Sequence, residues 1–428
     1  MAPCPFPSSL MTRICILGGG FGGLYTALEL CQLPWQTPPT ITLVDRNERF
    51  VFLPLLYELL TGEMEDWQVA PRYADLIAEA QAQKSVKLEF CQDTVETIDL
   101  DSHQVKLGSG HTLDYDYLTL ALGSETPLHQ VPGAADHAIS FRQLADVHRL
   151  RQALATWEQT TQTTGIPVHI AIVGAGASGV ELACKLSDRL GSQGEIHLIE
   201  RGSEILGGFS AASTAAARQA LDQRGIPVEL NSEVTEIGAD RIQWQRHQPD
   251  ETDQIPMPEM LSVNGVIWTA GTQPIPLIQA LDLNRDDRNR IQIKPTLQTQ
   301  DRPEVFALGD LAAVVDATGA RIPATAQAAF QQAGYCAWNI WALATAERPL
   351  LPFRYEPLGE MLSLGVDTAV LSSMGLTLTG PWGYLARRTV YLARMPTLEH
   401  QIRVGWSWIT RPLSDLPSWL QAVGGKGS

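Results

Sequence analysis

The sequence predicts an α/β protein built from two Rossmann-like dinucleotide-binding domains. Two glycine-rich segments, 18–23 and 174–179, each follow an apolar run typical of a buried strand and precede a helical pattern. In both places an acidic residue closes the next apolar run. Because the whole arrangement recurs, and because 428 residues are too many for one compact core, we expect two nucleotide-binding units.

The first unit begins with a predicted strand at 13–17, a helix at 24–30 and a strand at 41–44. In such a unit the first glycine makes the turn, the second lets the backbone approach a pyrophosphate, and the third lets helix and strand pack closely. An acidic residue at the end of the second strand can accept hydrogen bonds from ribose hydroxyls. The residues expected at this site are Gly18, Gly20, Gly22, Gly23 and Asp45.

The second unit repeats the pattern with a strand at 169–173, a helix at 180–190 and a strand at 196–199. A second dinucleotide is therefore expected on Gly174, Gly176, Gly179 and Glu200. Each unit also has a later apolar strand that ends on glycine. We expect these turns, at Gly123 and Gly271, to lie near the nucleotides.

The composition argues against several classes of function. A formal net charge of -16 argues against nucleic acid as a partner, since phosphate binding needs a basic surface. The six cysteines form no Cys-x-x-Cys pair, so we expect neither a metal site nor a redox-active dithiol, and a reducing compartment fits best. No apolar stretch approaches the roughly 18 residues of a spanning helix. Residues 1–10 do not resemble a signal peptide, and Met11 is a candidate start.

Three further segments resemble type II NAD(P)H:quinone oxidoreductases. They are Phe-Leu-Pro-Leu-Leu-Tyr-Glu at 52–58, Val-Glu-Leu-Ala at 180–183 and Ala-Thr-Ala-Gln-Ala-Ala-Phe-Gln-Gln at 324–332. Within that family, segments 13–25, 335–341 and 355–362 are similar to the demethylphylloquinone reductases of cyanobacteria and chloroplasts. The resemblance covers nearly the whole chain after Met11.

This resemblance implies that the first unit binds FAD, that the second binds NADH or NADPH, and that the chain then returns to complete the FAD domain. The implied divisions are 12–144 and 286–348 for FAD, 145–285 for NAD(P)H, and 349–428 for a C-terminal membrane-associating region. Asp310, after an apolar strand at 305–308, is expected to meet the ribityl chain of FAD. Further FAD contacts are expected from Arg46, Val95, Ala326 and Gln327.

Three residues are candidates for the chemistry. Gln327 and Gln331 lie four apart and share one face of a predicted helix. The resemblance implies that they present amides to the flavin and to the quinone carbonyls; the alternative is a pair of solvated glutamines. Glu181 lies in the first turn of the second nucleotide helix. The resemblance places it near nicotinamide and flavin, where it would influence hydride or proton transfer, and the alternative is a carboxylate that stabilises the helix N-terminus.

The choice between NADH and NADPH stays open. Glu200 favours NADH because a carboxylate there accepts from a free ribose hydroxyl and repels a 2′-phosphate. Arg201 can bind that phosphate if Glu200 turns away, and the alternative for Arg201 is an exposed loop charge. The resemblance to the demethylphylloquinone reductases favours NADPH.

The C-terminal region differs from the rest in charge. Between Pro381 and Pro412 five arginines accompany a single acid, Glu399, and aromatic residues are interleaved with them. Such a segment suits the headgroup region of a membrane. The alternative is a small packed domain with an aromatic core and solvated arginines. The residues are Arg387, Arg388, Arg394, Arg403, Arg411, Trp382, Tyr384, Tyr391, Trp406 and Trp408.

The activity implied is a two-electron transfer from NAD(P)H through FAD to a membrane-dissolved prenyl naphthoquinone, with demethylphylloquinone as the expected substrate. Its reduction would precede ring methylation in phylloquinone biosynthesis, because methyl transfer needs the electron-rich ring of the quinol. The expected location is peripheral, on the cytoplasmic face of a thylakoid or plasma membrane if the source is cyanobacterial, and a homodimer is one candidate state. The alternatives are a respiratory type II NADH dehydrogenase that feeds the general quinone pool, and a non-catalytic flavin redox sensor.

Overall fold

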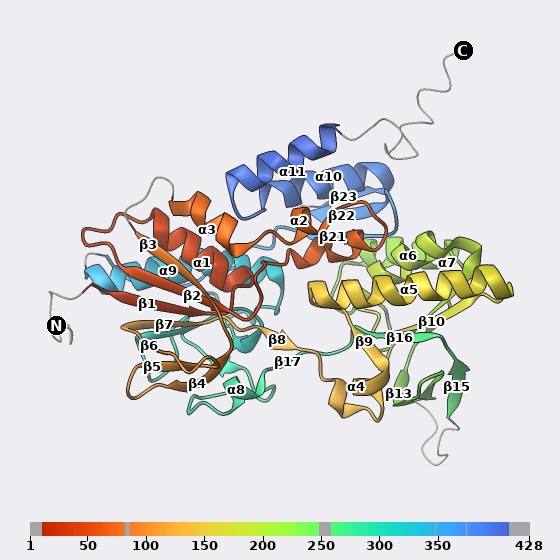
Figure 1. Cartoon of the computed structure of the whole chain (residues 1–428), viewed down its shortest axis with the longest axis horizontal. Helices are drawn as coiled ribbons and strands as arrows, with labels where there is room; N and C mark the ends of the chain where they lie inside the picture. The colour runs from red at the N-terminus through yellow and green to blue at the C-terminus, as the bar shows by residue number, and fades with distance from the viewer. Residues whose placement is uncertain (1–10, 82–85, 248–257, 347, 374, 411–428) are drawn as a thin grey trace.

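The computed structural model describes residues 11–410 apart from 82–85, 248–257, 347 and 374. Two five-stranded parallel sheets form its two halves, which lie side by side in Figure 1. The first sheet has the order β19-β7-β1-β2-β3. Its strands are β1 (Arg13–Leu17), β2 (Thr40–Asp45), β3 (Lys87–Gln92), β7 (Tyr117–Leu120) and β19 (Val305–Ala307). The nearly continuous apolar runs of β1 and β7 suit strands that are covered on both faces.

The first half is completed by helices and by small antiparallel sheets. Helix α1 follows β1 and packs along α9, which comes from far later in the chain. The helical elements are α1 (Phe21–Gln32), η1 (Leu53–Leu59), α2 (Asp66–Val69), α3 (Tyr73–Gln81), α8 (Pro276–Gln279), η4 (Gly309–Leu311) and α9 (Ala326–Thr345). The remaining strands are β4 (Val95–Asp99), β5 (Gln104–Leu107), β6 (Thr112–Asp114), β18 (Ile291–Gln292) and β20 (Ala312–Ala313).

The second sheet has the order β12-β11-β10-β16-β9. Its strands are β9 (Ala138–Ser140), β10 (Val168–Val173), β11 (Gly194–Ile199), β12 (Val228–Glu229) and β16 (Gly265–Trp268). Around it lie η2 (Leu128–Gln130), α4 (Ala134–His137), α5 (Leu144–Thr164), α6 (Ala177–Leu190), η3 (Gly191–Gln193), α7 (Ala211–Gln223), β13 (Ser232–Ile237), β14 (Arg241–Arg246) and β15 (Glu259–Ser262).

The second half begins earlier in the chain than the expected boundary at residue 145. Strand β9 precedes that residue, yet it pairs in parallel with β16. A three-residue strand gives no periodic signal in the sequence, so only the pairing reveals it. The chain passes between the halves at a short antiparallel pair, β8 (Ser124–Glu125) with β17 (Gln273–Pro274), which lies between the two sheets in Figure 1.

The C-terminal region forms a layer of its own. Its elements are β21 (Glu360–Ser363), β22 (Ala369–Ser373), β23 (Leu376–Thr379), α10 (Gly380–Ala393) and α11 (Leu398–Thr410). The three strands form an antiparallel sheet on which α10 packs, and α10 and α11 lie together at the top of the view in Figure 1. None of the helices within the described ranges is both long enough and apolar enough to cross a membrane. The predicted fold class, with two Rossmann-like units and an added C-terminal region, is confirmed.

Candidate active site

The first glycine loop has the geometry that a nucleotide needs. Gly18 adopts a φ of +97°, a conformation that favours glycine, and a Cβ on Gly23 would lie 1.8 Å from the Gly18 carbonyl oxygen. A Cβ on Gly20 would meet nothing within 4 Å, so a ligand can approach the backbone there. Gly20 also precedes α1 without a side-chain cap, which leaves helix N–H groups for an anion. Asp45 Oδ2 accepts from the Gly19 N–H at 2.7 Å.

The second loop repeats this geometry closely. Gly174 has a φ of +100°, a Cβ on Gly179 would lie 1.8 Å from the Gly174 carbonyl oxygen, and a Cβ on Gly176 would meet nothing within 4 Å. Helix α6 begins after Gly176, again without a side-chain cap. Glu200 Oε2 accepts from the Ala175 N–H at 2.6 Å. The two acids at the strand ends therefore hold equivalent positions.

A cavity of about 1850 Å³ extends from the first loop to the second half and the C-terminal region. It is larger than the roughly 300–1,000 Å³ of ordinary ligand pockets, as a dinucleotide with a second ligand requires. The expected site residues that line it are Gly18, Gly20, Gly22, Asp45, Arg46, Val95, Gly123, Glu181, Asp310, Ala326 and Gln327. The expected residues outside its lining are Gly23, Gly174, Gly176, Gly179, Glu200, Gly271 and Gln331.

The expected NAD(P)H loop nevertheless lies next to this cavity. Ala177 and Ser178, directly after Gly176, contribute to the cavity lining, as do Thr269 and Thr272 on either side of Gly271. Gly271 itself makes a turn with a φ of +73°. The loop expected to bind NAD(P)H therefore adjoins the cavity that the first loop lines.

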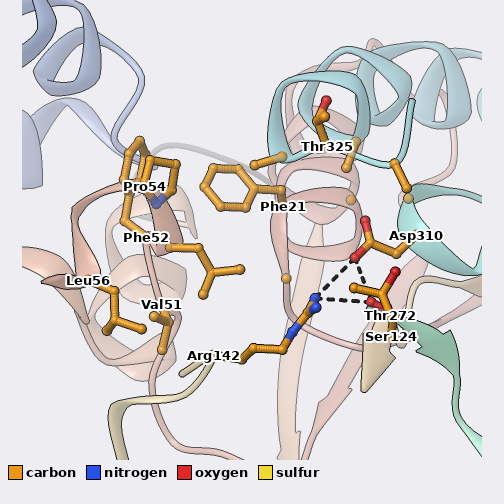
Figure 2. A pocket seen from close by; sticks show the side chains of 18 of the residues that line it. Phe21, Val51, Phe52, Pro54, Leu56, Ser124, Arg142, Thr272, Asp310 and Thr325 are labelled. Atoms are coloured by element: carbon orange, nitrogen blue, oxygen red, sulfur yellow. Dashed lines mark hydrogen bonds and ion pairs between the residues drawn. The ribbon is translucent and has the colours of Figure 1, made fainter. Parts of the chain in front are cut away.

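A polar cluster around Asp310 joins the two halves across the cavity. The Asp310 carboxylate accepts from the Ser124 hydroxyl at 2.7 Å and from the Arg142 guanidinium at 3.1 Å. Arg142 also donates to the Ser124 hydroxyl at 3.0 Å, which closes the triangle drawn in Figure 2. Arg142 is a cavity residue that the sequence did not indicate, because a lone arginine after a short strand carries no recognisable pattern.

The wall opposite this cluster is apolar. Figure 2 shows Val51, Phe52 and Leu56 across the cavity from Asp310 and Ser124. The Phe52 ring contacts Phe21 edge to face, with 5.2 Å between the ring centroids. One polar and one apolar wall suit a flat, amphipathic ring system.

The two glutamines of α9 have different surroundings. Gln327 lines the cavity, and its amide nitrogen is buried without a hydrogen-bond partner in the described part of the chain. The Gln331 amide instead pairs with the backbone of Glu356, donating at 2.8 Å and accepting at 2.9 Å. The two glutamines were predicted to share one helix face. Gln331 nevertheless does not line the cavity, because its amide is already hydrogen-bonded to the backbone of Glu356.

Glu181 lies where all three parts of the molecule meet. The helix begins at Ala177, earlier than expected, so the buried Glu181 lies just beyond its first turn, which contains no acidic residue. Its Oε1 accepts from the Tyr57 hydroxyl of η1 and, at 2.8 Å, from the Ser363 N–H of β21. Burial raises the pKa of Glu181 to about 7, although the charge of Arg387 and the bond from Tyr57 act in the opposite direction. A carboxyl group with this pKa can take up and release a proton near neutral pH.

Arg387 of α10 is buried under this cluster. Its guanidinium donates to Glu58 Oε1 at 2.5 Å, to the Pro54 carbonyl at 2.6 Å and to the Tyr57 hydroxyl at 2.7 Å. Burial alone would raise the pKa of Glu58, but the charges of Arg387 and Lys185 hold it below its ordinary value. Glu58 therefore stays ionised next to Arg387.

The C-terminal arginines lie in different surroundings. Arg387 is buried in an ion pair, and Arg388 stacks over the Trp408 ring at 4.2 Å. Arg403 stacks over Trp67 at 5.4 Å, and Arg394 lines the cavity, while Arg411 lies outside the described residues. Arg387 is buried and Arg388 and Arg394 are partly buried, whereas Arg403 stays exposed beside the Trp67 ring.

The aromatic residues divide in the same way. Tyr384 and Tyr391 are buried, whereas Trp382 and Trp406 are about two-thirds exposed, at 67% and 65%. Further large apolar side chains are exposed on β23, α10 and α11, where Leu398, Ile402 and Trp406 follow one stripe of α11. The exposed apolar set is Leu376, Leu378, Trp382, Leu385, Leu398, Ile402, Trp406 and Ile409. We call it the apolar face.

The chain resembles known flavoproteins over nearly its whole length. The family model for pyridine nucleotide-disulphide oxidoreductases matches residues 12–333. Demethylphylloquinone reductase NdbB of Synechocystis sp. is 48% identical over 96% of this chain and 98% of its own length. The alternative NAD(P)H-ubiquinone oxidoreductase C1 of Arabidopsis thaliana is 38% identical over 97% of this chain and 84% of its own. The structure of NDH2 from Plasmodium falciparum with NADH shares the fold, with a TM-score of 0.81 at 17% identity over 94% of this chain and 98% of that chain.

Proposed function

Because the chain belongs to the pyridine nucleotide-disulphide oxidoreductase family, we propose that it reduces demethylphylloquinone to the quinol with electrons from NAD(P)H. The protein is an FAD-dependent NAD(P)H:quinone oxidoreductase. The observation that carries the choice of quinone is the 48% identity with a demethylphylloquinone reductase, which extends through the C-terminal region. Reduction to the quinol would prepare the ring for attack on a methyl donor.

The residues of the cavity fit FAD. The open backbone at Gly20 and the uncapped start of α1 accept the pyrophosphate, Asp45 takes the ribose end, and Asp310 with Ser124 takes the ribityl chain. The buried, unpaired amide of Gln327 provides a donor for the flavin or for the quinone next to it. When bound, FAD accepts hydride from NAD(P)H and passes two electrons to the quinone.

Glu181 supplies the proton that the quinone needs. Quinol formation takes up two electrons and two protons. A hydride brings two electrons and only one proton, so one further proton is needed. A buried carboxyl group with a pKa of about 7 can hold a proton inside the cavity at neutral pH. The hydrogen bonds from the Tyr57 hydroxyl and the Ser363 N–H fix the position of this carboxyl group. We therefore assign Glu181, which lines the cavity, as the proton donor for quinone reduction.

The apolar face is the surface that meets the membrane. Tryptophan and large aliphatic side chains on a helix that lies flat suit the boundary between headgroups and acyl chains. The cavity extends to Tyr391 and Arg394 of the same C-terminal layer, so docking through this face would bring the cavity close to a lipid-dissolved quinone.

The substrate assignment is tested by comparing quinones at equal concentration in detergent micelles. We expect a higher kcat/KM with a prenylated demethylnaphthoquinone than with a ubiquinone of the same chain length. This order should hold with either NADH or NADPH as the donor, and chromatography should identify the quinol as the product. Equal or higher kcat/KM with ubiquinone would instead favour a dehydrogenase that feeds the general quinone pool.

A further inference from the structure

A cluster of metal-ligating side chains lies in the second half, apart from the active site. His169 lies on β10, and Glu195 and His197 lie on β11. The register of these parallel strands pairs His169 with Glu195. Because side chains alternate along a strand, all three residues project from the same face of the sheet. Their nearest ligand atoms lie within 4.8 Å of one another.

One ring nitrogen of His169 is buried without a hydrogen-bond partner in the described part of the chain. Its Nδ1 is buried and makes no hydrogen bond within the described ranges, although it lies 3.4 Å from Glu195 Oε2. Asn264 makes two hydrogen bonds to the backbone of His169. Its side-chain Oδ1 accepts from the His169 N–H at 2.8 Å, and its backbone N–H donates to the His169 carbonyl at 2.8 Å. Buried ring nitrogens are ordinarily satisfied, and coordination to a cation would satisfy this one.

Two imidazoles and a carboxylate form a donor set typical of Zn²⁺ with an open fourth position. Tetrahedral bonds of about 2.0–2.1 Å separate the ligand atoms by about 3.3 Å. The 3.4 Å between His169 Nδ1 and Glu195 Oε2 already matches that separation. We propose that His169, Glu195 and His197 form a binding site for a divalent transition-metal ion of the Zn²⁺ type.

This site is distinct from the reaction centre. His169 and Glu195 are the second residues of β10 and β11, and His197 is the fourth residue of β11, whereas Gly174 and Glu200 follow the C-terminal ends of the same strands. Five residues at about 3.3 Å each put His169 roughly 16 Å from Gly174, and none of the three ligands lines the cavity. A bound ion links two central strands of the sheet, so it stabilises the folded protein by mass action without entering the path of the electrons.

The test is a calorimetric titration of the FAD-loaded protein with Zn²⁺. The protein carries no polyhistidine tag and is first treated with a chelator. We expect one equivalent of tight binding and a rise in melting temperature with Zn²⁺. In His197→Gln the affinity should fall by more than the roughly 10- to 100-fold that follows loss of an outer-shell partner. The matched control is His247→Gln, which changes an exposed histidine of the same half that pairs with Glu233.

A second measurement keeps the proposal testable if a variant loses FAD. The electron paramagnetic resonance spectrum of Cu²⁺ on the wild-type protein should show coupling to two imidazole nitrogens, and His169→Gln should remove one of them. Retention of the tight equivalent in a properly folded His169→Gln/His197→Gln protein would overturn the proposal. A wild-type spectrum with fewer than two nitrogens, or no tight binding at all, would overturn it equally.

Discussion

Replacement of Arg387 by methionine is expected to destabilise the protein by about 3–5 kcal/mol. Arg387 and Glu58 are both fully buried, and Glu58 Oε2 has no hydrogen-bond partner in the described part of the chain. Without the guanidinium, Glu58 is a buried charge that has lost its closest counter-ion. The Pro54 carbonyl and the Tyr57 hydroxyl also lose a donor, and each such bond is worth about 1 kcal/mol within that total.

A double variant separates the ion pair from simple loss of packing. Replacing a buried ion pair by apolar residues of similar volume is often close to neutral. We therefore expect Arg387→Met/Glu58→Leu to be more stable than either single variant and within about 2 kcal/mol of the wild type. The assay is thermal unfolding of all four proteins, followed by far-ultraviolet circular dichroism and by the fluorescence of released FAD.

An exposed ion pair provides the control for this experiment. Lys106 and Glu96 pair at 2.7 Å with both side chains about half exposed, so Lys106→Met should cost less than about 1 kcal/mol. The reasoning would be refuted if the losses of the Arg387 and Glu58 single variants simply added in the double variant, because additive losses mean that the two sites are independent.

Three further predictions concern proton transfer, donor choice and membrane binding. Because burial raises the pKa of Glu181 from its ordinary 4.5 to about 7, the protonated donor is lost as pH rises through 7. The rate of flavin reoxidation by quinone should therefore fall over that range. In Glu181→Gln the stopped-flow rate should be low and should not change with pH. A raised carboxyl pKa also means that the stability contributed below pH 4.5 is lost as pH rises through 7, so this variant should be no less stable than the wild type at pH 8, whereas a large loss there would indicate a structural role. Glu200→Gln should raise the kcat/KM ratio of NADPH over NADH by about tenfold, equivalent to about 1.4 kcal/mol of relieved repulsion; an unchanged ratio in steady-state assays would contradict the role of this carboxylate. Trp406→Glu should weaken binding to anionic phospholipid vesicles in flotation assays, whereas Met260→Glu, at a similarly exposed apolar residue of β15, should not; equal effects would argue against the apolar face.

Local sequence patterns were sufficient for the parts of the site that depend on a single turn. The loop glycines and the acids Asp45 and Glu200 are where their spacing predicts, because a strand, a tight turn and a helix start are determined by neighbouring residues. The expectation for Asp310, which lines the cavity, came instead from the family resemblance. These features need no knowledge of which distant segments meet.

Features that depend on distant segments could not be predicted in this way. Arg387 reads as one member of a basic surface segment, and only the packing of α10 on η1 reveals Glu58 as its partner. The position of Gln331 depends on the chain near Glu356, 25 residues further on. The cluster of His169 with His197 comes from the pairing of two strands, and the spacing of the cysteines carries no signal for it.

Quinone reduction is tested most directly by stopped-flow absorbance of the purified FAD-loaded protein. The flavin is first reduced with NADH or NADPH under anaerobic conditions and is then mixed with a demethylnaphthoquinone. We expect rapid bleaching by the nicotinamide and rapid return of the flavin absorbance on adding the quinone, with the second phase slowed in Glu181→Gln. Bleaching that no quinone reverses would contradict the assignment as a quinone reductase and would indicate a flavin redox sensor.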